Sequence, residues 1–446
     1  MAPGYLGEAE ILAECQLPWA GLYRTHESQN IAAVAACIAG AFRGDSEITL
    51  GSRRSLAVIA VDGLGYRVAA ADLAPDVLIP LTTTFPSTTT TAFLTSLTGR
   101  SPSQHGVIGV QYLHPDGRRA YNCITGGVTE PDGADQVGAD QVGAGPVGAG
   151  PVGAGPVGAG PVRATASPAL RTAFTELGDL GVPAFCLPGE LAQVSPDWQA
   201  AAFEGARMLN DRPVLDGQEA GGPVPDGDGW PLPDDAGRPS TGDAGPLPGD
   251  SGVDAIVDAV TSDLEAALAR HRSGLVWAYL NLDDHLHRNG PDHAIARACR
   301  AVDALARRLS QAGAAVLLYA DHGCAASRPG AGTMAGWDEL SSPLTCRLPA
   351  GGAGRVRWLY PHAGQEAQLA GRLRALLPDA VLTTPAELAR CGVVEHGSIG
   401  QARLGEIVLL ASGPDFPVPE PALAYEHGSL TAAEMLVPLA IWQPAC

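Results

Sequence analysis

The sequence of 446 residues predicts an α/β protein whose central sheet is mostly parallel and covered by helices on both faces. Two observations support this fold class. Short apolar runs of strand length recur along the chain, and segments with helical spacing lie between them. Strands of a parallel sheet are buried on both faces and therefore read as continuous apolar runs, as these do. Apolar residues make up 46% of the chain, which is enough for a large core.

The elements follow in order from these patterns. The apolar runs predict strands, and they occupy residues 55–61, 273–282, 313–320, 406–412 and 436–442. The segments with helical spacing predict helices, and they are Ser87–Leu97, Pro168–Leu177, Val253–Arg270, His293–Gln311 and Glu366–Leu377. Residues 1–54 are expected to form a helical extension that packs on one large domain, residues 55–446.

Two segments contain much of the Gly and Pro, of which the chain has 56 and 37 residues. Residues 133–162 repeat GADQV twice and then GAGPV four times, and residues 213–252 mix Gly, Pro and Asp without a period. Neither segment has the large apolar side chains that a packed core requires. We therefore expect both to be disordered insertions without a chemical role.

Charge and cysteine content exclude several classes of function. The formal net charge is −20 and every basic residue is Arg, so binding of a nucleic-acid duplex is not expected. The nine Cys include no CxxC pair, which argues against a zinc knuckle or a disulfide framework. No signal peptide or membrane-spanning run is recognisable. A cytoplasmic protein without a membrane partner is expected.

Three of the predicted strands run into an aspartate. The runs that end near residues 61, 282 and 320 are followed by Asp62, Asp283 and Asp321. Ligands of an open parallel sheet bind outside the carboxyl ends of its strands, so these carboxylates are expected to meet there. Like charges held close together are unfavourable unless a cation compensates them. Each Asp alone is compatible with an ordinary cap, but three together favour a metal site.

Histidines near the same strand ends extend this set. His287 follows Asp283 by four residues, His322 directly follows Asp321, and His427 precedes the last apolar run. Mixed Asp and His ligands suit zinc or a similar divalent ion. Six ligands are too many for one tetrahedral ion but suit two ions that share a substrate, the arrangement that clamps phosphoryl oxygens.

A threonine-rich segment between the first two aspartates offers a nucleophile. Pro86 is compatible with the first turn of a helix, which places Thr84 near the N-cap. A helix N-terminus favours a phosphate, and a hydroxyl bound there to a divalent ion becomes a stronger nucleophile. The segment alone favours an ordinary threonine cap. Together with the Asp and His set, it favours Thr84 as the nucleophile.

These residues resemble the alkaline phosphatase superfamily, in particular its type I phosphodiesterase and nucleotide pyrophosphatase family. The matching motifs occur in family order from residue 55 to 442: V-D-G-L-G at 61–65, T-F-P-S at 84–87, L-T-G-R-S-P-S-Q-H-G-V at 97–107, D-D-H-L-H-R-N-G-P at 283–291, D-H-G at 321–323 and E-H-G at 426–428. The resemblance implies two zinc ions and a small anionic phosphoester as the substrate.

By the same resemblance, specific residues are expected to bind the ions. One ion would be bound by Asp62, Thr84, Asp321 and His322. The other would be bound by Asp283, His287 and His427. Thr84 would attack phosphorus and form a phosphothreonine, which water then hydrolyses.

The sequence departs from the family beside the substrate. Where nucleotide pyrophosphatases usually have an Asn after H-G-V, this chain has Val110, followed by Gln111. Gln111 and His362 are therefore the candidate substrate-binding residues. Residues 329–403 resemble the insertion that caps the site in this superfamily, and their Arg355 and Arg357 are further candidates for contact with an anion.

Three functions remain open at this point. The first is a phosphodiesterase or nucleotide pyrophosphatase. The second is a phosphomonoesterase or a phosphonate hydrolase on the same scaffold. The third is a non-catalytic, metal-binding regulatory member of the family.

Overall fold

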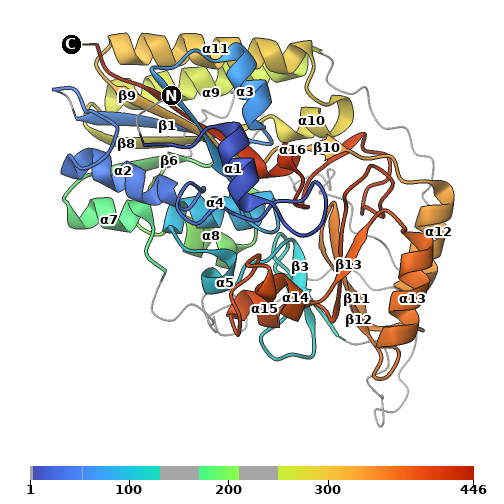
Figure 1. The fold of residues 1–446 in the computed structure, drawn as a ribbon. Coiled ribbons are helices and arrows are strands. Elements are labelled where there is room, and N and C mark those ends of the chain that lie inside the picture. Colours follow the sequence, from blue (N-terminus) through green and yellow to red (C-terminus); the bar gives the residue numbers. More distant parts are fainter. Residues whose placement is uncertain (1–3, 53, 131–169, 210–249, 446) are drawn as a thin grey trace, which may run out of the picture.

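Two sheets organise the computed structural model, which describes residues 4–52, 54–130, 170–209 and 250–445. Figure 1 shows the central sheet with helices on both of its faces and the second sheet beside it. The predicted insertion 133–162 lies outside the described residues, as does 213–252 apart from its last three positions. Within the described ranges, no helix is both long enough and apolar enough to cross a bilayer.

The central sheet has seven strands in the order β2-β16-β9-β1-β8-β6-β7. All described pairs are parallel except those of β16, which runs antiparallel to β2 and β9. This confirms the predicted fold class. The strands are β1 (Ser55–Asp62), β2 (Val77–Thr82), β6 (Ala184–Leu187), β7 (Arg207–Met208), β8 (Gly274–Asn281), β9 (Ala315–Ala320) and β16 (Leu436–Trp442).

Helices cover both faces of this sheet (Figure 1). On one face lie α3 (Tyr66–Asp72), α9 (Asp250–Arg270) and α11 (His293–Gln311). On the other lie α2 (Ala33–Arg43), α4 (Thr89–Thr98), α7 (Ala173–Asp179) and α8 (Pro196–Ala202). Shorter elements complete this part: α1 (Glu8–Cys15), α5 (Pro102–His105), the 3₁₀ turn η1 (Gly189–Gln193), α10 (Asp283–Asn289) and α16 (Ala432–Met435).

The second sheet has the order β13-β14-β12-β11-β3-β4-β5, and its described strand pairs are antiparallel. It draws on segments before and after the range 329–403. Its strands are β3 (Gln111–Leu113), β4 (Ala120–Asn122), β5 (Val128–Thr129), β11 (Cys346–Ala353), β12 (Val356–Pro361), β13 (Val381–Thr383) and β14 (Ile407–Leu410). One face joins the main core through Val356, Trp358 and Val408. The other packs on α12 (Ala331–Leu340) and α13 (Glu366–Leu376).

Three local predictions differ from the structure. The apolar run 406–412 forms β14 in the second sheet, because an apolar run does not show which sheet a strand joins. The helix expected from Ser87 begins at Thr89, with Pro86 outside its first turn. Thr88 is the N-cap residue and has extended backbone (φ −144°, ψ 148°). The helix expected over 168–177 is α7, which begins at Ala173, while residues 168–169 lie outside the described part.

A buried ion pair joins the two sheets. The Arg355 Nε donates to Glu434 Oε1 at 3.1 Å, and the two residues are 2% and 0% exposed. The Glu434 carboxylate also accepts hydrogen bonds from the Ser429 N–H (2.9 Å) and the Thr431 hydroxyl (2.6 Å). The backbone N–H of Arg355 donates to the His427 carbonyl at 2.7 Å. The pair therefore fixes the loop that carries His427 against the start of β12.

We expect Arg355→Met to lower the free energy of unfolding by about 3–5 kcal/mol, because the Glu434 carboxylate would remain buried without its cation. Denaturant unfolding of the full chain measures this. Arg347→Met is the control, since Arg347 lies on the adjacent strand and pairs with the exposed Glu406. An exposed pair contributes about 0–1 kcal/mol. Equal losses in the two variants would contradict the assignment.

Candidate metal centre

The first group of potential ligands lies at the ends of two neighbouring strands. β1 and β9 pair in parallel with Val61 opposite Ala320, so both strands deliver their next residue to the same edge of the sheet. Asp62, Asp321 and His322 meet there, all buried. The His322 Nε2 lies 3.4 Å from Asp62 Oδ1 and 3.2 Å from Asp321 Oδ2.

The second group is built around the start of α10. Asp283 is the first residue of this helix, and His287 lies one turn later on the same side. His427 joins them from the loop after β15 (Tyr425–Glu426). Asp283 Oδ2 lies 2.8 Å from His287 Nε2 and 3.5 Å from His427 Nε2. These three residues are also buried and offer ligand atoms to one ion.

The two groups adjoin through stacked imidazoles. The rings of His322 and His427 are 3.8 Å apart between centroids and inclined by 21°. One ring belongs to each group. Six of the seven sequence-predicted ligands thus lie in two adjacent groups. The seventh, Thr84, would offer a hydroxyl, and its contact is described below.

Backbone carbonyls orient all three histidines. The Nδ1 atoms of His287, His322 and His427 lie 2.8, 3.1 and 2.9 Å from the carbonyl oxygens of Tyr425, Gly323 and Ser87. Because a carbonyl only accepts, each Nδ1 carries the proton. The lone pair of a neutral ring is then on Nε2, the atom that faces the carboxylates. Metal-binding histidines are oriented in this way.

The carboxylates keep oxygens free for a cation. Asp283 Oδ1 and Asp321 Oδ2 are buried and have no hydrogen-bond partner. The other oxygen of Asp321 accepts from the N–H groups of Gly63 (3.1 Å) and His322 (2.8 Å). Burial, and after it the charge of Asp321, raises the pKa of Asp62 well above its usual value. Buried carboxylates with unpartnered oxygens and mutually repelling charges fit divalent ions.

The threonine that faces the first group is Thr89. Its Oγ1 lies 3.4 Å from Asp62 Oδ1 and 3.2 Å from His322 Nε2, at the first residue of α4. The hydroxyl of Thr84, by contrast, donates to the Pro86 carbonyl at 3.0 Å. The helix begins two residues later than the sequence predicts, which puts Thr89 at its first position.

The predicted substrate-side residues lie in other surroundings. The Gln111 amide donates to the Ala350 carbonyl at 3.3 Å within the second sheet. His362 contacts the Pro343 carbonyl beyond the far end of β12, about 20 Å along the strand from Val356. The Arg355 guanidinium is held by Glu434, and that of Arg357 lies 5.5 Å from the centre of the Trp337 ring on the α12 side of the sheet.

Sequence reasoning missed two residues of this site. Thr89 stands in a run of four threonines, and the usable signal was a Ser/Thr cap directly before the apolar residues of α4. Tyr279 lies inside the apolar run of β8 and donates from its hydroxyl to Asp62 Oδ2 at 2.5 Å. A tyrosine within a strand carries no signal of its own, because aromatic residues are common in strands.

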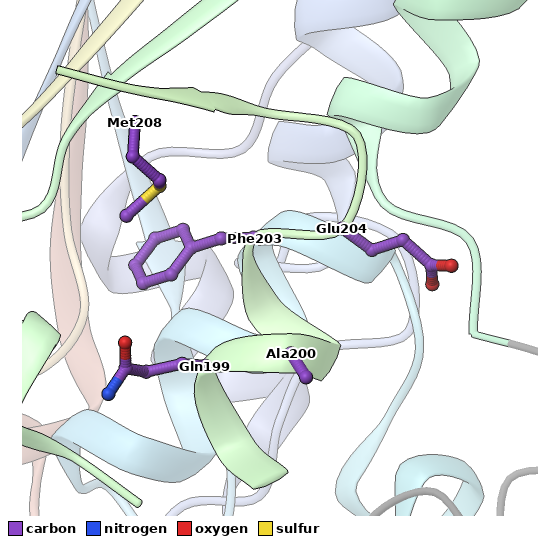
Figure 2. A pocket seen from close by; sticks show the side chains of 5 residues that line it. All are labelled: Gln199, Ala200, Phe203, Glu204 and Met208. Atoms are coloured by element: carbon purple, nitrogen blue, oxygen red, sulfur yellow. The ribbon is translucent and has the colours of Figure 1, made fainter. Parts of the chain in front are cut away.

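An open hollow of about 270 Å³ occurs beside α8 and β7. Figure 2 shows the side chains that line it: Gln199, Ala200, Phe203, Glu204 and Met208. None of these belongs to either ligand group. The candidate site therefore rests on the converging buried donors, and this hollow has no part in it.

The sheet order and the two ligand groups agree with the alkaline-phosphatase-like fold that the sequence resembles. The sequence profile of the type I phosphodiesterase / nucleotide pyrophosphatase family matches residues 57–342, well over half of the chain. The chain belongs to this family and is a phosphoric ester hydrolase. The family is metal-dependent, and the two ligand groups agree with this. Among curated protein sequences, none matches the chain.

Solved structures share the fold at low sequence identity. Murine ectonucleotide pyrophosphatase / phosphodiesterase 5 is similar with a TM-score of 0.51 and 14% identity, over 87% of this chain and 88% of that chain. Phosphonoacetate hydrolase from Sinorhizobium meliloti, solved with phosphonoacetate, has a TM-score of 0.52 and 15% identity, over 89% and 93%. These likenesses support the fold.

Removal of divalent ions should destabilise the protein, because the buried carboxylates then repel one another. A site that is exposed to an ion concentration of 100 times its Kd adds about 2.7 kcal/mol to the free energy of unfolding. Thermal unfolding with a chelator and with added Zn²⁺ measures the difference. His322→Ala, which removes one ligand, should show a smaller gain on adding Zn²⁺. A protein with the same midpoint in chelator and in Zn²⁺ would contradict this interpretation.

Proposed function

We propose that this enzyme hydrolyses small phosphodiesters with Thr89 as its nucleophile, between two divalent ions of which zinc is the best match to the ligands. The observation that carries the proposal is the position of the Thr89 hydroxyl. It faces Asp62 and His322 of the first ligand group, and the second group adjoins through the stacked ring of His427. We propose Thr89 in place of Thr84 for this reason.

In the proposed reaction, different groups of the chain supply the nucleophile and the hydrogen-bond donors. The hydroxyl of Thr89 loses its proton as its oxygen attacks phosphorus, and the ester bond to the leaving oxygen breaks. The leaving group departs as an alcohol, and Thr89 forms a phosphodiester that keeps the second ester group of the substrate. The first N–H groups of α4 have no carbonyl partner within the helix, so they are available to donate to phosphoryl oxygens. Ions bound by the two groups would lower the pKa of the hydroxyl and neutralise phosphoryl charge. Water then cleaves the bond between phosphorus and the Thr89 oxygen, which releases a phosphomonoester and restores the Thr89 hydroxyl.

The surroundings of the site favour a diester over a monoester. A monoester carries a second negative charge, which calls for further cationic or hydrogen-bonding donors. Val110 supplies an apolar side chain where nucleotide pyrophosphatases usually have Asn. The guanidinium of Arg355 is held by Glu434, and Arg357 lies on the sheet face that packs on α12. Val110 therefore adds no donor for a second charge, and the Arg355 guanidinium is already engaged by Glu434.

Thr89→Ala should lower kcat for a bis-aryl phosphate by at least about 10³-fold, because the step that requires the nucleophile is lost. Thr84→Ala is the matched control, and its kcat should stay within about threefold of the wild type. Steady-state hydrolysis by the metal-loaded proteins measures both. Near-normal turnover by Thr89→Ala, or its loss in Thr84→Ala alone, would overturn the assignment.

Metal analysis tests the number and identity of the ions. The full chain should retain about two equivalents of zinc, since each group offers three buried donor residues. His427→Ala and His322→Ala should each reduce the tight stoichiometry to about one, because each removes a ligand from a different group. A wild-type stoichiometry of one, or a strong preference for magnesium, would contradict the two-zinc proposal.

A second candidate activity is phosphonate hydrolysis, favoured by the similarity to phosphonoacetate hydrolase. We expect the catalytic efficiency to rank bis-aryl phosphate first, ahead of mono-aryl phosphate and phosphonoacetate. The loaded enzyme is assayed with all three at equal concentration. A preference for phosphonoacetate would shift the assignment to the second candidate. Retained metal without hydrolysis of any ester in a broad panel would favour a regulatory, non-catalytic role.

A further inference from the structure

A buried tyrosine binds one oxygen of the Asp62 carboxylate and leaves the other oxygen facing the candidate ion site. The Tyr279 hydroxyl, on β8, donates to Asp62 Oδ2 at 2.5 Å. Asp62 Oδ1 is left facing Thr89 Oγ1 and His322 Nε2, each at 3.4 Å. Tyr279 is itself outside both ligand groups. Its hydroxyl therefore fixes the rotation of the Asp62 carboxylate, so that one oxygen points toward the ion site.

Packing fixes the tyrosine in turn. The Phe93 ring of α4 meets it edge-on, with ring centroids 5.7 Å apart. On another side lies Gly189 of η1, whose φ is +53°. A Cβ at Gly189 would lie 2.9 Å from Tyr279 Cδ1, which is closer than carbon atoms normally approach. The hydroxyl position is thus set by α4 and η1.

The same kind of constraint acts on the other ligands of the first group. Two backbone N–H groups hold Asp321 Oδ1, and a carbonyl holds His322 Nδ1. Asp62 is the ligand of this group that a side chain orients. In the second group, Asp283 Oδ1 has no hydrogen-bond partner. A change at Tyr279 should therefore reach one group only.

We propose that Tyr279 is a positioning residue that sets the ion affinity of the Asp62–Asp321–His322 group by holding Asp62 Oδ2. Loss of a partner that orients a metal ligand lowers metal affinity about 10–100-fold. The effect on ion binding rests on the geometry of this group alone. A further effect on the alignment of Thr89 rests on the proposed function.

The neighbouring strand provides a matched control. Tyr319 of β9 is also buried, and its ring meets the same Phe93 at 6.2 Å. Its hydroxyl lies 3.0 Å from Ser96 Oγ and accepts from Trp277 Nε1 at 3.2 Å. Tyr319→Phe thus removes a hydroxyl from the same core, but the partners of this hydroxyl are Ser96 and Trp277, which are not candidate ligands.

The test compares Tyr279→Phe and Tyr319→Phe in the full chain. Each protein is first freed of metal and then titrated with Co²⁺ as the only added ion. Calorimetry gives the affinities, and the visible absorption of bound Co²⁺ reports the ligand geometry. We expect Tyr279→Phe to weaken one of two binding events about 10–100-fold and to change its spectrum. The other event, and both events in Tyr319→Phe, should stay within about twofold. Wild-type affinities in Tyr279→Phe, or equal weakening in both variants, would overturn the proposal.

A second variant keeps the test independent of the removed hydroxyl. Gly189→Ala places a methyl group against the Tyr279 ring and should weaken the same binding event. Unchanged Co²⁺ binding in Gly189→Ala and Tyr279→Phe together would reject the positioning role. The outcome is separate from the proposed function, because selective weakening of one ion supports the inference even if Thr89→Ala remains active.

Discussion

The structure depends on the meeting of three buried aspartates at the carboxyl end of one sheet. Asp62 ends β1, and Asp283 and Asp321 follow β8 and β9, the strands on either side of β1. Buried carboxylates that repel one another favour a compensating cation, and the surrounding groups orient the side chains that would bind it. Carbonyls orient the three histidines, two N–H groups hold Asp321, and a tyrosine hydroxyl holds Asp62.

The second sheet also helps to position the candidate metal centre. His427 is the candidate ligand furthest along the chain, and it lies on a loop that is fixed to β12 through the Arg355–Glu434 pair. Ser87, just before α4, accepts from the ring of His427 with its carbonyl and bonds to Ser429 with its hydroxyl. The helix that presents Thr89 and the loop that presents His427 are therefore positioned against each other.

Much of the fold could be predicted from the sequence, and the elements that could not be predicted have physical reasons. The strands β1, β8, β9 and β16 are buried throughout and read as unbroken apolar runs. Those of the second sheet are short or interrupted by Gly, as in β11, and carry weaker patterns. The run that became β14 was recognised as a strand but assigned to the wrong sheet. Its own residues do not encode its partner.

The sequence by itself determined the donor types, because aspartates at strand ends and histidines at fixed offsets are local patterns. It also determined the α/β class and the family. Only the tertiary structure decided which threonine faces the site. Thr84 and Thr89 lie in one threonine-rich segment, and the helix start at Thr89 selects between them. Only the tertiary structure revealed Tyr279, because the hydrogen bond to Asp62 joins two strands that are far apart in the sequence.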